Sequence, residues 1–456
     1  MSKTNEPINA GVKQRHSINE PVAARPRMLV LRGHRISWVG IESNEALQRG
    51  CDQSAWLERL AQEGIRHVLV PLNGASEDAC MFARKHVIQA GHESPLYDLE
   101  HRDEGFFTRL KFLMEAAAET GVLLGLSLFD AQAGAGHGPL RGDANVQGLS
   151  LEDQKSSAED ARRAAILSHA AEWVCSAVRA SRGVYVQVLR NTRGEPGPLE
   201  RALSGRIARI FSQQGEDLSP ERLGPWVVER NAVVGEASRF SAPLELSRTV
   251  RCPKRKTRQA AALNFYGALE RAGVERGMSA ADALFGLESP GQTALLRFEA
   301  GALEGERMDW LWQAFFRGWW PVVALRVAEK DSARALENTA ALARFSSAWS
   351  RRSALRACAG IVQQAAGEKC PASFAAEDDG GRFFIYFKQP ALEGLRLRLP
   401  AGLQRYSWID PLSGKCLDRG DGVNGGARAD ITGLNDARAR LLIVEPSEAA
   451  DAQSSL

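Results

Sequence analysis

Short apolar runs alternate with amphipathic stretches from about residue 28 to about residue 345. The runs are rich in Val, Leu and Ile, which is typical of strands buried on both faces of a sheet. Six of them stand out along the chain: RISWVGI, HVLVPLNG, VLLGLSLFD, GVYVQVLRN, TALLRFEAG and WPVVALRV. We therefore expect these six segments to form strands of one sheet.

Between the runs, apolar residues recur at helical spacing. In FFTRLKFLMEAAAETG, Phe106, Leu110 and Leu113 fall on one face, and Gly121 suits the left-handed residue that ends a helix. QSAWLERLAQEG repeats this pattern and ends at Gly64. Strands that alternate with helices in this way predict a parallel sheet.

The length of this region favours a (β/α)8 TIM barrel over residues 28–345. A doubly wound parallel sheet is the alternative architecture. Residues 207–253 are poorly periodic, so the pattern does not locate the fifth and sixth strands.

A different pattern follows the barrel. Residues 346–374 predict a connecting helix, and residues 375–445 contain short alternating segments separated by Gly, Pro and Asp. Segments of this kind predict a small antiparallel β-sandwich. Residues 1–27 and 446–456 are polar and predict flexible tails.

Composition narrows the class of protein. Hydrophobic residues make up 44% and charged residues 25%, as in an ordinary globular protein, and the net charge of +3 does not indicate a nucleic-acid partner. The seven cysteines form no CxxC pair, which favours a reducing compartment. With no apolar leader at the start and no run long enough to span a membrane, we expect a cytoplasmic protein without a membrane partner.

Common cofactor and metal motifs do not occur in the sequence. GAGHG follows a strand but lacks the Lys-Ser/Thr that a phosphate-binding loop requires, and the basic run RCPKRKTR is typical of a solvated loop. No HExxH or EF-hand pattern occurs, and His34 and His137 lack partners at ligand spacing. We therefore expect neither a cofactor nor a metal.

In a barrel, the chemistry lies where strands end at their carboxyl side. TALLRFEAG supplies Glu299 near its end, and the earlier strands offer Glu42, Asn44 and Asp130 at their ends. Glu299 is the strongest candidate, because an apolar strand carries its carboxylate to the rim. A rim ion pair between Glu299 and Arg297 or Arg317 is the alternative interpretation.

Several segments, in order, resemble the cellulase-type clan A glycoside hydrolases. SPLYDLEHRDEGFFTRLKFLMEAAAETGVLLGLSLFD is similar to their SPF…DL…YF.RL…A...GI.V...LFD segment, and GHGPLRGDANVQGL to their P-F-N-x-x-N-N-V-N-G loop. GVYVQVLRN occupies the place of the strand that ends in Asn-Glu, and RFEAGALEGERMDWLWQAFFRGWWPVV resembles the stretch around the nucleophile. YFKQPALEGLRLRLPAGLQRYSWIDPLSGK is similar to the sandwich domain that is often fused to such barrels.

The resemblance implies two carboxylates that flank a glycosidic bond, one as nucleophile and one as acid/base. Glu299 matches the nucleophile. The acid/base position reads Asn191, and an amide cannot exchange the proton that the reaction needs. Glu195, Asp130 or Glu42 could replace the missing acid, but a degenerate site is the preferred interpretation.

A degenerate site can still bind sugar, because aromatic platforms pack on sugar rings while polar groups fix their orientation. The candidate substrate-binding residues are Trp38, Asp130, Asn145, Arg190, Asn191, Arg317, Trp319 and Trp320. For each tryptophan, packing in the core is the alternative role.

Three functions remain open. The preferred one is a glycan-recognising protein, with an oligo- or polysaccharide as partner and with lost or impaired hydrolysis. The second is an active retaining glycosidase that uses Glu299 and a relocated acid such as Glu195. The third is a non-catalytic scaffold with a protein partner docked on the sandwich or on the basic loop.

Overall fold

A computed structural model gives the architecture of the chain. It describes residues 29–31, 34–72, 79–89, 92–130, 139–149, 157–178, 181, 184–190, 226–228, 233–234, 245–250, 294–300, 309–316, 319–325, 332–349, 356–358, 360–363, 373–378, 380–387, 395–431, 434 and 440–447. The two expected tails lie outside these residues, apart from Pro446 and Ser447. Among the described residues, no helix is long and apolar enough to cross a membrane.

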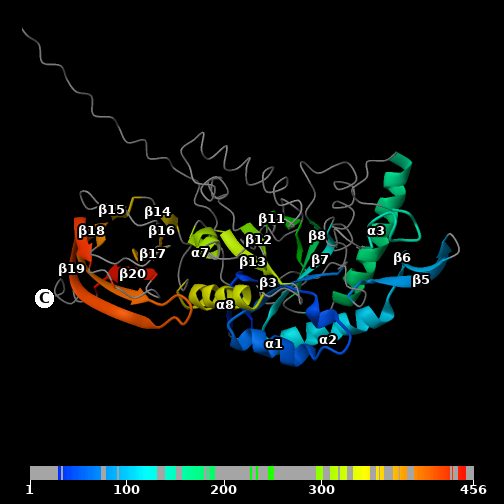
Figure 1. The fold of residues 1–456 in the computed structure, drawn as a ribbon, viewed down its shortest axis with the longest axis horizontal. Coiled ribbons are helices and arrows are strands. Elements are labelled where there is room, and N and C mark those ends of the chain that lie inside the picture. The colour runs from blue at the N-terminus through cyan, green and yellow to red at the C-terminus, as the bar shows by residue number, and fades with distance from the viewer. Residues whose placement is uncertain are drawn as a thin grey trace, which may run out of the picture.

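A parallel sheet organises the first part of the chain (Figure 1). Its strands in chain order are β3 (Gly40–Glu42), β4 (His67–Pro71), β7 (Leu123–Asp130), β8 (Val184–Arg190), β9 (Trp226–Val228), β11 (Glu245–Val250), β12 (Ala294–Glu299) and β13 (Trp319–Ala324). In space they run β9-β8-β7-β4-β3-β13-β12-β11, and each neighbouring pair is parallel. A short strand, β10 (Val233–Val234), pairs antiparallel with β9.

Each of the six apolar runs overlaps a strand of this sheet, so the prediction of a mixed α/β fold with a parallel sheet is confirmed. The structure adds β9 and β11 in the region where the sequence pattern located no strand. The last parallel strand, β13, lies beside the first, β3. A separate hairpin, β1 (Leu29–Leu31) with β2 (His34–Ile36), precedes the sheet.

The two helices that the periodicity predicts are present as α1 (Gln53–Gln62) and α2 (Glu104–Thr120), and the structure adds η1 (Glu45–Leu47) and α3 (Ser157–Val178). The Asp103 carboxylate caps α2 by accepting a hydrogen bond from the Phe106 amide at 2.6 Å. Gly121 ends α2 with φ of 68°, in the left-handed conformation that glycine adopts without strain.

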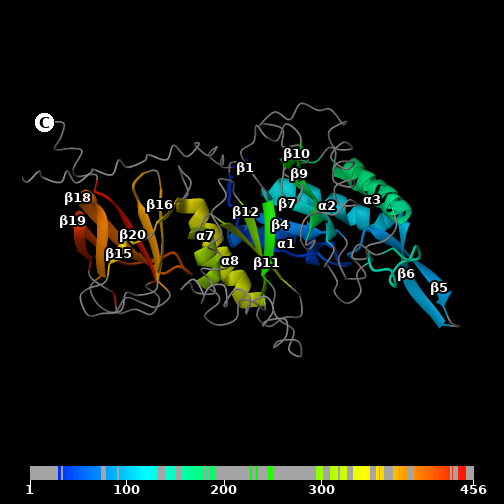
Figure 2. The same cartoon turned by 90° about the horizontal axis from the view of Figure 1, so that it is seen from above.

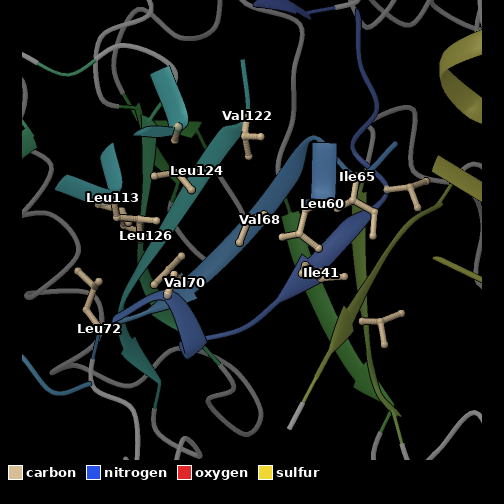
Figure 3. Packing of buried hydrophobic residues seen from close by; sticks show 14 of the residues in the cluster. Ile41, Leu60, Ile65, Val68, Val70, Leu72, Leu113, Val122, Leu124 and Leu126 are labelled. Atoms are coloured by element: carbon tan, nitrogen blue, oxygen red, sulfur yellow. The ribbon is translucent and has the colours of Figure 1, made fainter. Parts of the chain in front are cut away.

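The core lies between the parallel sheet and these helices (Figure 3). Ile41, Val68 and Leu124 come from neighbouring strands and pack with Leu60 of α1 and Leu113 of α2. Successive side chains of a strand point to opposite faces. One face of the sheet is therefore the helix-bearing face, and the alternate residues lie on the other face.

An antiparallel hairpin projects from the body of the protein after β4 (Figures 1 and 2). It consists of β5 (Phe82–Gln89) and β6 (His92–Arg102). The helix–strand pattern did not predict it, because the segment has neither the apolar content nor the regular alternation of a buried strand.

The second part of the chain is antiparallel, as predicted. Its strands are β14 (Arg356–Cys358), β15 (Val362–Gln363), β16 (Ser373–Glu377), β17 (Phe383–Phe387), β18 (Leu395–Ile409), β19 (Cys416–Ile431) and β20 (Leu441–Pro446). They join in one seven-stranded sheet, in which the long strand β18 pairs with β15, β19 and β20.

The connecting helix expected over 346–374 is wrong at two described segments, where the structure has β14 and β15. Helix α8 (Ser332–Trp349) covers the first residues of this range, and 350–355 and 364–372 lie outside the described residues. Gly360 lies between these two strands with φ of 74°, a conformation that no α-helix contains. Pairing with β16 and β18 therefore outweighs the helical propensity of the alanine-rich sequence.

Aromatic side chains join the two parts into one core. Helix α7 (Asp309–Phe316) lies with α8 between the two sheets (Figure 2). The Trp312 ring stacks on Tyr386 of β17 at 5.2 Å, and the Tyr386 hydroxyl donates a hydrogen bond to the Asp309 carboxylate at 2.7 Å. The core thus continues across the predicted domain boundary.

Candidate functional site

Two glutamates lie in one row at the carboxyl end of the parallel sheet. Glu299 of β12 is in register with Ala324 of β13, and Ala324 is in register with Glu42 of β3. Adjacent strands are about 4.8 Å apart, so the two glutamate α-carbons are about 10 Å apart. The residue between them has the small side chain of alanine.

Alternation places this row on the face opposite the helices. Phe298, Val323 and Ile41 are the preceding residues of the same three strands, and all three belong to the buried cluster that contacts the helices. Glu299 and Glu42 therefore share the other face. That face would be the interior if the strands close into a barrel.

Backbone hydrogen bonds hold the end of β3 in place. The Glu42 carbonyl accepts from the Leu325 amide at 2.9 Å, and the Ser43 amide donates to the Leu69 carbonyl at 3.0 Å. The Glu42 residue is only 6% exposed. This carboxylate is therefore part of the folded interior rather than a solvated rim charge.

Two further polar groups come from β7 and from the residues that follow β3. Ser127 of β7 alternates with the core residues Leu126 and Leu128, and its fully buried hydroxyl finds no hydrogen-bond partner in the described part of the chain. Asn44 follows β3, is half-buried, and its side chain makes no capping hydrogen bond to η1. Sequence reasoning missed Ser127, because a serine within an apolar run gives no sign of its partner.

Asp130 and Arg190 are in register with each other at the ends of β7 and β8. Both residues end their strands at the same edge of the sheet as Glu42 and Glu299, and their substrate contacts stay predictions. Three other predicted site residues lie outside the described residues: Asn191, Glu195 and Arg317.

The three tryptophans predicted to stack on sugar lie at the amino ends of their strands, whereas Glu299 lies at a carboxyl end. Trp319 and Trp320 begin β13, whereas Ala324 ends it beside Glu299. Trp38 precedes β3, is 4% exposed and packs its ring edge-on against His67 at 5.5 Å. The structure therefore does not bring these tryptophans together with Glu299, and Trp320 packs on Phe315 of α7.

His67 forms a tight contact at this amino-terminal edge. Its Nδ1 donates to the Trp38 carbonyl at 2.8 Å, and complete burial lowers the pKa of His67 to about 4. A β-carbon added at Gly40 would lie 2.2 Å from the His67 carbonyl oxygen. Gly40 is therefore required by close packing of β3 and β4.

Asn145 supports a loop rather than an open surface. Its side-chain nitrogen lies within hydrogen-bond distance of the Pro139, Arg141 and Leu149 carbonyls, and its oxygen accepts from the Leu149 amide at 2.9 Å. The residue is 3% exposed. The side-chain amide that was predicted to bind substrate is thus hydrogen-bonded to backbone groups of its own loop.

Asp98 of β6 ties the hairpin to this loop. Its carboxylate accepts from Gln147 at 2.7 Å, pairs with Lys85, and bonds His101 at 2.8 Å. Burial alone would raise the pKa of Asp98, but these hydrogen bonds and one from the Glu100 amide lower it to about 2. No local pattern in the sequence predicts this network, since it depends on pairing between β6 and the loop.

Titratable groups do not gather into a metal site among the described residues. The arrangement that remains at the carboxyl edge is the Glu299–Ala324–Glu42 row. Two carboxylates on one face are the group set that glycosidic chemistry uses.

Comparison with known proteins shows the class of fold. One similar solved structure is a glycoside hydrolase family 5 protein from Bacteroides vulgatus, with 11% identity, a TM-score of 0.52, and coverage of 89% of this chain and 88% of that one. A second, described as a glycoside hydrolase, has 11% identity and a TM-score of 0.51, with 93% of this chain and 97% of that one covered. No family model and no curated protein matches the sequence. The chain therefore has a glycoside-hydrolase-like fold.

Proposed function

We propose that this protein recognises a glycan at the carboxyl end of its parallel sheet and that its hydrolytic activity is lost or impaired. The observation that carries the proposal is the position of Glu299 at the end of β12, on the face shared with Glu42, in a glycoside-hydrolase-like fold. We further propose that the eight parallel strands close into a TIM barrel between β9 and β11, followed by a small β-sandwich.

The cyclic strand order supports barrel closure. In a (β/α)8 barrel the last strand lies beside the first, as β13 lies beside β3. The edge strands of the described sheet are β11 and β10, the short strand that pairs with β9 and lies between β9 and β11 in the chain. Active sites of such barrels lie at the carboxyl ends of the strands, where Glu299 and Glu42 end β12 and β3.

Impaired hydrolysis follows from the residue after Arg190. The resemblance to clan A hydrolases assigns the acid/base role to this position, which is Asn191. Without a proton donor, departure of a sugar alkoxide is slower by about 10²- to 10⁴-fold. A leaving group that departs as a stabilised anion, such as dinitrophenolate, does not need a proton from the protein.

Binding and cleavage are tested separately. Calorimetric titration with methyl glucoside, galactoside, mannoside, xyloside and fucoside, in both anomeric forms, reports binding. The expected result is saturable binding of at least one glycoside, weakened at least tenfold by Glu299→Gln and unchanged by Glu45→Gln, a control carboxylate in η1. No binding to any glycoside, or equal binding by the Glu299 variant, contradicts the proposal.

Cleavage is measured with 2,4-dinitrophenyl and methyl glycosides of the sugar that binds. We expect slow release of dinitrophenolate and much slower release of methanol. Equally efficient cleavage of both substrates would mean that the acid is fully present, and would establish the active glycosidase instead.

A further inference from the structure

We propose that Glu42 is the second carboxylate of this site and that residual hydrolysis uses it as the acid/base in place of Asn191. The inference rests on the proposed function, because both locate the ligand at the carboxyl ends of β12, β13 and β3. Of the three acids that the sequence leaves open for this role, it selects Glu42.

The register makes the pairing geometrically accessible. Glu299 and Glu42 lie two strands apart on one face, with α-carbons about 10 Å apart and only the Ala324 side chain between them. An α-carbon separation of about 10 Å on one face is compatible with the ~5 Å carboxyl separation of retaining glycosidases. A bulkier residue at Ala324 would keep them apart.

Glu42 is also better placed than the other acid described at a strand end. Asp130 ends β7, which lies four strands from β12 in the sheet, whereas Glu42 ends β3, two strands from β12. The Leu325 and Leu69 hydrogen bonds fix the backbone on both sides of Glu42, so its carboxylate starts from a defined position. Preorganisation of this kind is what acid catalysis requires.

The chemistry balances without any added reagent. Protonated Glu42 donates its proton to the glycosidic oxygen as the bond from that oxygen to the anomeric carbon breaks, and a Glu299 oxygen bonds to the anomeric carbon. The Glu42 carboxylate then takes a proton from water, whose oxygen attacks the same carbon. The Glu299 ester bond breaks, and both carboxyl groups return to their starting states.

The test compares leaving groups in matched variants. Rates for 2,4-dinitrophenyl and unsubstituted phenyl glycosides of the sugars named above are measured for the native protein, Glu42→Gln, Glu42→Asp and the control Glu45→Gln. Glu42→Gln is expected to lower kcat/KM for the phenyl glycoside at least 100-fold. Its effect on glycosyl-enzyme formation from the dinitrophenyl glycoside, read as the burst of dinitrophenolate, is expected to stay below tenfold.

The pH profile provides a readout that a structural role would not change. The phenyl glycoside profile of the native protein should fall at high pH, and Glu42→Gln should remove that limb. Glu42→Asp keeps a carboxylate at this position, so it replaces the glutamine variant in the test if that variant does not fold. Its shorter side chain should lower the phenyl glycoside rate about tenfold or more.

Failures of the two proposals are distinguishable. If no glycoside binds or reacts, the proposed function fails. If glycosides bind in a Glu299-dependent manner but the native protein cleaves no phenyl glycoside, or if the Glu42 variants match native rates, the role of Glu42 is overturned while glycan recognition stands.

Discussion

Acid should destabilise this protein through one buried imidazole. His67 is fully buried, and its pKa is lowered from 6.5 to about 4 by burial, which outweighs the hydrogen bond to the Trp38 carbonyl. The unfolded chain therefore takes up a proton near pH 6.5, whereas the folded chain resists protonation until about pH 4. The stability contributed by neutral His67 is complete above pH 6.5 and is lost as the pH falls toward 4.

The magnitude follows from the difference between the two pKa values. A shift of about 2.5 units corresponds to about 3 kcal/mol in total at ~1.4 kcal/mol per unit, of which about 2 kcal/mol is lost between pH 7.5 and pH 5. Other groups titrate over the same range, so the comparison must be made against a variant. His67→Asn keeps a donor near the position of Nδ1 and removes the titration.

Urea unfolding at pH 7.5 and pH 5, followed by tryptophan fluorescence, measures the effect. We expect the native protein to lose about 2 kcal/mol more than His67→Asn over this interval. Equal losses in the two proteins would refute the reasoning, because they would show that His67 is protonated in the folded state or is not buried as described.

Three substitutions test the packing. Gly40→Ala should destabilise the fold by about 3 kcal/mol, because the new β-carbon meets the His67 backbone, and thermal unfolding measures it; an unchanged Tm would contradict the β3–β4 approach. Gln313→Leu in α7 should stabilise the protein by about 1–2 kcal/mol in urea, because both polar atoms of its fully buried amide lack partners in the described part of the chain. Tyr386→Phe should cost about 1–3 kcal/mol by leaving the buried Asp309 carboxylate short of a donor, and a loss below 0.5 kcal/mol would mean that water replaces the hydroxyl.

The hydrophobic pattern located six of the eight parallel strands, because each of the six reads as a continuous apolar run, as expected for strands buried on both faces. It missed β9 and β11, and it mistook 356–363 for helix. Those short segments become strands through pairing with distant partners, and local propensity carries little information about such pairing.

The candidate site, like the short strands, could be predicted from the sequence only in part. Glu299 could be assigned to a strand end from its run alone, and the register confirms that position. Trp319 and Trp320 begin their apolar run, so in a parallel sheet they lie at the amino end of their strand, away from Glu299. The partnership of Glu42 with Glu299 depends on β13 lying between their strands, which no local pattern in the sequence reveals.

The central claim is that a sugar binds at the carboxyl ends of β12 and β3. A crystal structure of the protein with the methyl glycoside selected by titration tests it directly. The account predicts the sugar ring within hydrogen-bond distance of the Glu299 and Glu42 carboxylates, on the face of the sheet away from α1 and α2. A ring bound on the β5–β6 hairpin, on the antiparallel sheet or at the amino ends of the strands would contradict it.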